Sequence, residues 1–209
     1  MNKANLILIG AGGHARSCID IIEHEGSYKI AGLVGLAHEV GLKQFGYQVL
    51  GPDSELIELA NQYPYALITV GQILTADHRI RLYQQALDVG FKLPEVIAPT
   101  AYVSPHATIG AGTIVMHGAI INAGAIIGNN CIINNRALIE HDAHVADHCH
   151  VSTGAILNGD TSIGRGSFIG SGTIIREGLA IDANSVVGMG LSIRKGLIES
   201  NERLGEATP

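Results

Sequence analysis

The hydrophobic positions of residues 97–193 follow a strict period of six. An aliphatic residue occupies every sixth position from Ile97 to Ile193, and a small Ala, Cys, Ser or Thr follows four places later in most repeats. An α-helix requires apolar spacings of three and four, and a half-buried strand requires alternation, so neither element fits. A pure six-residue period is typical of a solenoid of hexapeptides, in which three repeats form one triangular coil.

Residues 1–94 precede the repeat, and in them short apolar runs alternate with helical stretches. We expect strands at 5–9, 30–34, 66–70 and 92–97, and helices at 15–25, 53–62 and 75–89. This alternation predicts a small parallel sheet, whose ligand crevice lies at the carboxyl ends of the strands. The expected fold is a Rossmann-like α/β domain over residues 1–94, followed by a parallel β-helix over residues 95–209 that ends in a C-terminal tail.

A glycine-rich turn follows the first expected strand. Gly10, Gly12 and Ala15 satisfy the Gly-x-Gly-x-x-Ala pattern between a strand and a helix. Bare backbone N–H groups at a helix N-terminus suit a phosphate or a carboxylate, although such a turn can also merely join a strand to a helix. A dinucleotide site needs an acid after the second strand to hold the ribose, and none occurs before Glu39. The sequence therefore argues against NAD and predicts weak or less base-selective nucleotide binding.

Histidines are concentrated in the repeat, and four of them fall within ten consecutive positions. These four occupy different phases of the six-residue period, so they point from different edges and we expect no metal site. His141 projects outward, and the residues eighteen positions away, Ala123 and Gly159, leave a notch beside its imidazole. We expect His144 and His148 to be solvated loop residues.

Acetyl transfer from a thioester to an amine or a hydroxyl needs a base for the acceptor's proton and a donor for the oxyanion. The repeat resembles the left-handed parallel β-helix of the hexapeptide acyltransferases. The whole chain is similar to the bacterial sugar O- or N-acyltransferases of the sialic-acid O-acetyltransferase and UDP-4-amino-sugar N-acetyltransferase type. Glu140-His141-Asp142 matches the family motif Glu-His-(Glu/Asp). The resemblance implies that His141 is the base and that Asp142 strengthens it.

The same resemblance assigns the remaining site residues. Positions that match acetyl-CoA contacts are His150, Gly159, Ser171 and Met189. Positions that match acceptor contacts are Gly12, Gly13, His14, Gly71 and Asn134. The chain departs from the family pattern in three places. Met189 replaces a glycine, and the acidic pair that follows the second strand is absent. The segment that closes the solenoid is absent from residues 198–209. The resemblance also implies a homotrimer with CoA between adjacent solenoids.

Composition narrows the remaining choices. The net charge is −6 with no basic run, so nucleic acid is not an expected partner. The N-terminal apolar run is too short to span a bilayer and has no basic flank, so we expect a cytoplasmic protein without membrane contact. Cys131 and Cys149 fall at the small inward position, where we expect stacked core thiols. We therefore expect direct attack without a covalent acyl-enzyme.

The function that these observations favour is acetyl-CoA-dependent N-acetylation of a nucleotide-activated amino sugar in surface polysaccharide or glycan biosynthesis. One alternative is an O-acetyltransferase of a free sialic-acid-like sugar, which the missing acidic pair supports. Another is a catalytically silent scaffold that binds a nucleotide-sugar, against which the His141-Asp142 pair argues. The sequence leaves open the identity of the acceptor, the choice between amine and hydroxyl, and the acyl length.

Overall fold

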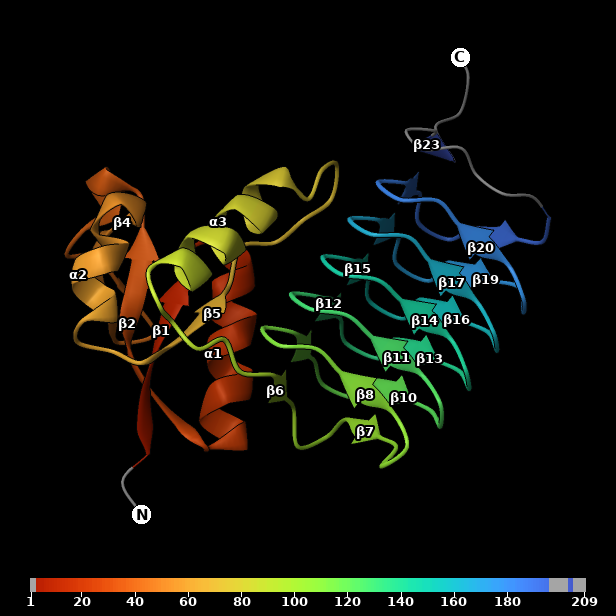
Figure 1. The fold of residues 1–209 in the computed structure, drawn as a ribbon, viewed down its shortest axis with the longest axis horizontal. Coiled ribbons are helices and arrows are strands. Elements are labelled where there is room, and N and C mark those ends of the chain that lie inside the picture. Colours follow the sequence, from red (N-terminus) through yellow and green to blue (C-terminus); the bar gives the residue numbers. More distant parts are fainter. Residues whose placement is uncertain (1–2, 196–202, 205–209) are drawn as a thin grey trace.

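The computed structural model describes residues 3–195 and 203–204, and it divides into a small α/β part and a solenoid (Figure 1). The first part is a five-stranded sheet in the order β3-β4-β2-β1-β5. Its strands are β1 (Ala4–Ile9), β2 (Tyr28–Gly35), β3 (Lys43–Gln44), β4 (Tyr47–Pro52) and β5 (Tyr65–Ile68). Its helices are α1 (Gly13–Glu25), α2 (Leu56–Ala60) and α3 (Asp77–Asp88), with 3-10 turns η1 (Ala37–Glu39) and η2 (Asp53–Glu55).

Strand β1, which lies between β2 and β5, has apolar side chains that pack on both faces of the sheet. Leu6 and Leu8 belong to one buried cluster with the apolar side of α1, whereas Ile7 and Ile9 belong to another with α2 and α3. Successive side chains of a strand point to opposite faces, so a continuous apolar run marks a strand buried on both sides. All pairings are parallel except the short antiparallel pair of β3 with β4.

Two sequence predictions for this part were wrong. Residues 92–97 form no strand of the first sheet: Lys92 makes only an isolated bridge to Tyr65, and β6 (Val96–Ile97) pairs with β9 (Ile114–Val115) of the solenoid. Pro94, which has no N–H for a ladder, lies between the two pairings. The sequence prediction also omitted β3 and β4, and α2 is shorter than the helix expected at 53–62.

The solenoid has three faces of stacked parallel strands. Face 1 consists of β6, β9 (Ile114–Val115), β12 (Ile132–Ile133), β15 (His150–Val151), β18 (Phe168–Ile169), β21 (Val186–Val187) and β23 (Arg203–Leu204). Face 2 consists of β7 (Tyr102–Val103), β10 (Ile120–Ile121), β13 (Leu138–Ile139), β16 (Ile156–Leu157), β19 (Ile174–Ile175) and β22 (Ser192–Ile193). Face 3 consists of β8 (Thr108–Ile109), β11 (Ile126–Ile127), β14 (His144–Val145), β17 (Ser162–Ile163) and β20 (Ala180–Ile181).

The period of six is confirmed residue by residue. Strands pair with partners eighteen residues away, as in Ile121 with Ile139, and the second residue of each strand points into the prism. A residue with positive φ recurs at every sixth position from 112 to 190, which is what a tight corner requires. The fold is therefore the expected α/β domain followed by a left-handed parallel β-helix.

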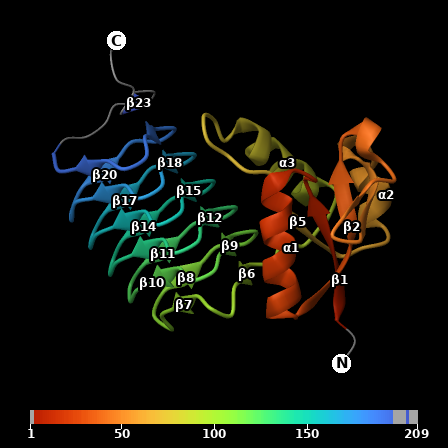
Figure 2. The same cartoon turned by 180° about the vertical axis from the view of Figure 1, so that it is seen from behind.

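The α/β part lies against face 1. Ile114, Ile132 and Met116 share a buried cluster with α1, and the fully buried Arg79 of α3 reaches the corner between faces 3 and 1. Figure 2 shows α1 beside β6 and β9. At the other edge of face 1, the His117 side chain contacts Asp20 of α1 at 3.1 Å. The corner between faces 2 and 3 is therefore the one farthest from the α/β part.

Candidate active site

His141 and Asp142 occupy the exposed corner between faces 2 and 3, after β13. His141 Nδ1 donates to Asp142 Oδ2 at 2.9 Å, and the two side chains are 66% and 68% exposed. Asp142 has a left-handed backbone (φ 60°), which turns its carboxylate back onto the preceding ring. This hydrogen bond raises the pKa of His141 above its usual value. The pairing orients the ring and leaves Nε2 available to accept a proton.

Gly159 lies directly against the ring of His141. A Cβ added at Gly159 would come within 2.6 Å of His141 Cε1 and 2.7 Å of Nε2. The coils are held in register here, because Asp160 N donates to His141 O at 3.0 Å and Asp142 N donates to Ala123 O at 3.1 Å. Within the described part of the chain, the N–H of Gly159 has no acceptor. The His141 imidazole therefore lies in the notch at Gly159, beside a backbone N–H that has no acceptor among the described residues.

A second group of the expected residues lines a cavity of about 280 Å³ at the carboxyl ends of β1, β2 and β5. Gly12, Gly13, His14 and Gly71 all lie in its wall. A Cβ on Gly12 or Gly13 would meet nothing within 4 Å, so the turn is open toward the cavity. Helix α1 begins at Gly13 with no side-chain cap, and its first N–H groups are therefore available to an anion.

His14 carries an orphaned polar atom at this cavity. Its Nε2 is buried and has no hydrogen-bond partner in the described part of the chain. Burial and the nearby Arg79 lower the pKa of His14 to about 3. A neutral ring with an unpaired nitrogen is suited to a hydrogen bond with a bound ligand.

The expectation that the cavity has no acid near the second strand was wrong. Glu39 and Asp53 both line it. Turn η1 folds Glu39 back so that its Oε2 accepts the Leu36 N–H at 2.7 Å, which brings the carboxylate to the end of β2. Sequence distance concealed this proximity, because an acid four residues beyond a strand reaches its end only when a tight turn reverses the chain.

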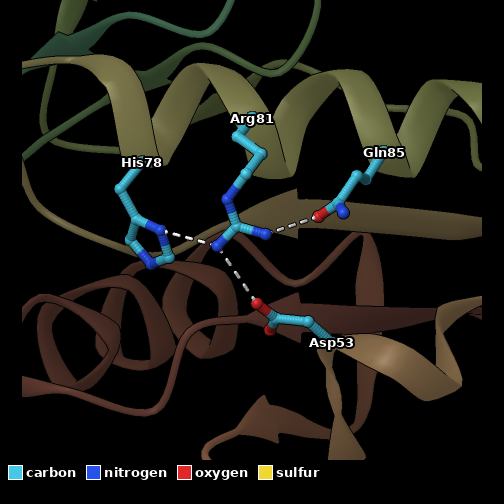
Figure 3. A network of polar contacts seen from close by, with 4 residues as sticks. All are labelled: Asp53, His78, Arg81 and Gln85. Carbon is cyan, nitrogen blue, oxygen red and sulfur yellow. Dashed lines mark hydrogen bonds and ion pairs between the residues drawn. The ribbon is translucent and has the colours of Figure 1, made fainter.

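Asp53 is part of a polar network at the rim of the same cavity (Figure 3). Arg81 of α3 contacts Asp53 Oδ2 at 3.5 Å, His78 Nδ1 at 2.9 Å and Gln85 Oε1 at 3.0 Å. The side chains of Asp53 and Arg81 are 36% and 49% exposed, respectively. This network links α3 to the end of β4. The hydrophobic periodicity of the sequence did not predict it.

The histidines on face 1 and its edge are buried under the α/β part. His150 Nδ1 donates to Gln72 O at 2.7 Å, and its Nε2 accepts from Asn134 Nδ2 at 3.1 Å. The expectation that His148 is solvated was wrong: it is 6% exposed and its Nδ1 accepts from Asn130 Nδ2 at 3.0 Å. Burial lowers the pKa of both His148 and His150 to about 4. His144, by contrast, is exposed as expected.

The expected site residues therefore form separate groups in one chain. Asn134, Ser171 and Met189 follow strands of face 1 and lie at or near the corner between faces 1 and 2, whereas His141 lies at the next corner. Asn134 thus contacts His150 and lies at a different corner from His141 of its own chain. Ser171 Oγ lies 2.9 Å from Ser152 Oγ, and Met189 is 79% exposed.

The cysteines are core residues, as expected. Cys131 and Cys149 are fully buried and stack one coil apart, and their thiols contact the carbonyls of Ala146 and Gly164. Burial raises the pKa of Cys131 to about 12 and raises that of Cys149 further, so neither is a thiolate at neutral pH. Among residues 3–195, no three His, Cys, Asp or Glu side chains are grouped to hold a metal ion. No described helix is long and apolar enough to cross a bilayer.

Comparisons with known proteins agree with this arrangement. Residues 5–85 match the model of the PglD N-terminal domain. The acetyltransferase domain of PglB from Neisseria gonorrhoeae is 31% identical over 94% of each chain, with a TM-score of 0.86. The same domain in complex with acetyl coenzyme A is 32% identical over 92% of this chain and 93% of that one, with a TM-score of 0.82.

A third relative is bound to CoA and a nucleotide-sugar. It is a histidine-to-asparagine variant of perosamine N-acetyltransferase from Caulobacter crescentus, in complex with CoA and GDP-perosamine. It is 32% identical over 93% of this chain and 90% of that one, with a TM-score of 0.87. A search among curated proteins found no significant match.

Proposed function

The chain belongs to the family of hexapeptide-repeat sugar acetyltransferases, and on that basis we propose that it acetylates the amine of a nucleotide-activated amino sugar with acetyl-CoA. The observation that carries the proposal is the His141-Asp142 pair on the exposed corner, with the N–H of Gly159 beside it. The perosamine relative has been solved with CoA and GDP-perosamine both unsubstituted and with one histidine replaced. The product serves surface polysaccharide or glycan assembly.

The proposed reaction is a direct attack. The neutral amine of the sugar forms a bond to the thioester carbonyl carbon, and His141 Nε2 accepts the proton that the nitrogen loses. The N–H of Gly159 donates to the oxyanion of the tetrahedral intermediate. That intermediate collapses with cleavage of the C–S bond, and the CoA thiolate leaves and takes up a proton. Asp142 holds the ring in the Nδ1–H tautomer and stabilises the imidazolium.

A covalent acyl-enzyme has no support in the chain's nucleophiles. The thiols of Cys131 and Cys149 are buried in the solenoid and held protonated. A thiol reacts as its thiolate, and only where the donor can reach it. Direct transfer requires only that the donor and the acceptor meet at His141.

The acceptor is proposed to bind in the cavity at the carboxyl end of the first sheet. Its diphosphate would lie over Gly12 and Gly13 at the start of α1, where backbone N–H groups and the helix dipole favour negative charge. The sugar would extend toward His14 and Gly71, which are adjacent in the cavity wall. In this proposal, residues 1–94 select the acceptor. The solenoid, which spans residues 95–209, performs the transfer. Residues 196–202 and 205–209 of its tail lie outside the described residues.

The geometry favours a homotrimer with each site between two subunits. Within one chain the acceptor cavity adjoins face 1, whereas His141 occupies the corner opposite that face. If face 2 of each prism is turned toward a threefold axis, the corner with Ser171 and Met189 of one subunit approaches the corner with His141 of the next. A heterologous contact of this kind closes into a ring. His150 and Gly159 would then lie on either side of one donor groove.

Face 2 has the surface that such packing needs. The outward residues of its strands form an apolar column along the solenoid, which consists of Tyr102, Ile120, Leu138, Ile156 and Ile174. Tyr102 and Ile120 are 56% and 41% exposed in the single chain. The corresponding column of face 3 contains Thr108, His144 and Ser162 beside the exposed Ile126, and it is more polar. The apolar residues Ile114 and Ile132 of face 1 pack with the α/β part, whereas the apolar column of face 2 is uncovered, and this favours association through face 2.

The alternatives have less support. O-acetylation of a free sialic-acid-like sugar was supported by the missing acidic pair after the second strand. In the structure, however, the carboxylate of Glu39 lies at the end of that strand. A silent scaffold would not need the His141-Asp142 hydrogen bond at an exposed notch. We place the enzyme in the cytoplasm, because its three free, buried cysteines suit a reducing compartment.

The test is an acceptor panel with acetyl-CoA, in which release of free CoA thiol is followed. The panel contains GDP- and UDP-linked 4-amino sugars, the same amino sugars without nucleotide, and a free sialic acid. We expect turnover with at least one nucleotide-linked amino sugar and N-acetylated product by mass spectrometry, with the signal lost in His141→Ala. Turnover with the free sialic acid alone, to an O-acetylated product, would refute the proposal.

A further inference from the structure

The cavity of the first sheet has a carboxylate whose second oxygen is unoccupied. Glu39 Oε2 accepts the Leu36 N–H at 2.7 Å, and within the described part of the chain Oε1 has no hydrogen bond and Glu39 has no ion pair. The carboxylate is close to the end of β2, because a Cβ on Gly35 would lie 2.7 Å from Oε2. Glu39 is half-buried in the cavity wall, so this oxygen is an acceptor that solvent satisfies only in part.

A second carboxylate enters the same cavity from the neighbouring strand. Asp53 follows β4, which pairs with β2 in parallel, so the two carboxylates come from the ends of adjacent strands. Arg81 and His78 of α3 stand beside Asp53 at the rim, as Figure 3 shows. Arg81 contacts Asp53, whereas Glu39 has no cationic partner in the described part of the chain.

Two further features of the cavity indicate what kind of ligand these carboxylates meet. The open Gly12-Gly13 turn at the start of α1 presents donors to an anion, and the buried Nε2 of His14 lacks a partner among the described residues. An anion would repel a carboxylate, so Glu39 is suited to a neutral part of the ligand that donates hydrogen bonds. A ribose, which is joined to the diphosphate and has two hydroxyl donors, meets this requirement.

We infer that Glu39 holds the ribose hydroxyls of the acceptor's nucleotide, with Asp53 as the second acceptor at the rim; this inference rests on the proposed nucleotide-activated acceptor. Glu39 thereby does the work that an acid at the end of the second strand does in dinucleotide sites, although it stands later in the chain. The diphosphate lies over Gly12 and Gly13, and the ribose lies between Glu39 and Asp53. The cavity should then discriminate between ribose and deoxyribose.

The experiment compares nucleoside diphosphates that differ by one hydroxyl. UDP and GDP, each with its 2′-deoxy and 3′-deoxy counterpart, are titrated calorimetrically into the full chain. The variants are Glu39→Gln and, as a matched control, Glu58→Gln on the exposed side of α2. Glu39→Gln is chosen because the carbonyl oxygen of the new amide can still accept the Leu36 N–H, so the turn is kept while the free carboxylate oxygen is replaced by an NH₂ group.

We expect the wild-type chain to bind a deoxy form about tenfold or more weakly than the ribose form, as a hydrogen bond to a charged group implies. Glu39→Gln should lose affinity for the ribose form by a similar factor and bind the deoxy form as the wild type does. Glu58→Gln should behave as the wild type. Equal weakening of both forms, or undiminished discrimination in Glu39→Gln, would overturn the inference alone. Failure of the wild type to bind any nucleoside diphosphate would overturn the nucleotide-linked acceptor as well.

Discussion

Gly159→Ala should disable the base without unfolding the protein. The added Cβ would stand 2.6 Å from His141 Cε1, whereas ordinary contact begins at 3.4 Å, so the ring must shift by about 0.8 Å. The His141 side chain is 66% exposed and can move away from the coil. Gly159 does not have a positive φ, so alanine adopts its backbone conformation without strain. The melting temperature should therefore change little.

The catalytic loss follows from that displacement. A shift of roughly 1 Å in a reacting group costs on the order of 10²-fold in rate, so kcat should fall about 100-fold. His141→Ala, which removes the base itself, should cost roughly 10²–10⁴-fold. The assay is release of CoA thiol at saturating acetyl-CoA and acceptor, with circular dichroism as the control for folding.

The double variant separates two explanations for the loss. If Gly159→Ala acts by moving the ring, it should cost almost nothing further in the His141→Ala background, because no ring remains to be moved. If it acts by obstructing the donor carbonyl, the same factor should reappear there and the KM for acetyl-CoA should rise. Near-normal kcat in Gly159→Ala would show that His141 does not use the position seen in this structure.

Four further outcomes are expected. Asp142→Asn should move the acidic limb of the kcat/KM profile to lower pH, because the base works only when neutral and the bond to Asp142 is what raises the pKa of His141; an unmoved limb would assign it to another group. Gly13→Val should raise the acceptor KM and leave the acetyl-CoA KM nearly unchanged in steady-state kinetics, since its side chain would project into the first cavity; a change confined to acetyl-CoA would move the acceptor elsewhere. Light scattering at micromolar concentration should give a trimer, and Ile120→Glu on face 2 should dissociate it, whereas Ser162→Glu on face 3 should not. His14 and His150 have pKa values of about 3 and about 4 in the fold against 6.5 when unfolded, so unfolding takes up protons. The free energy of unfolding from urea titrations should therefore fall as pH drops from 6.5 toward 4, by up to roughly 1.4 kcal/mol per pH unit for each group, and a free energy that does not change with pH would mean that they are not held neutral.

The solenoid could be predicted from the sequence because each of its rules is local. The inward residue, the small residue and the corner of each coil recur at fixed offsets, so Ile121, Ala125 and Gly124 occupy the positions that the period assigns. The motif at residues 140–142 was equally local, since His141 and Asp142 are adjacent in the chain. No knowledge of distant contacts was needed for either.

The incorrect sequence predictions concern residues whose surroundings depend on distant parts of the chain. His148 is buried because α3 covers its corner, and no feature of its own coil marks that contact. Glu39 reaches the end of β2 because η1 reverses the chain, and the acid then caps the Leu36 N–H. The burial of His148 and the position of Glu39 both depend on contacts between segments that the fold brings together. Hydrophobic periodicity and secondary-structure propensity contain no information about such contacts.

The solenoid explains why its chemistry is concentrated at corners. Inward positions must be aliphatic and the adjoining positions small, so only outward and corner residues can vary without disturbing the core. Asp142 occupies a corner position with φ 60° that glycine fills in many other coils and that aspartate and asparagine tolerate. In this conformation its carboxylate contacts His141 Nδ1 directly. Replacement of Asp142 by glycine should keep this corner conformation while it removes the hydrogen bond to His141.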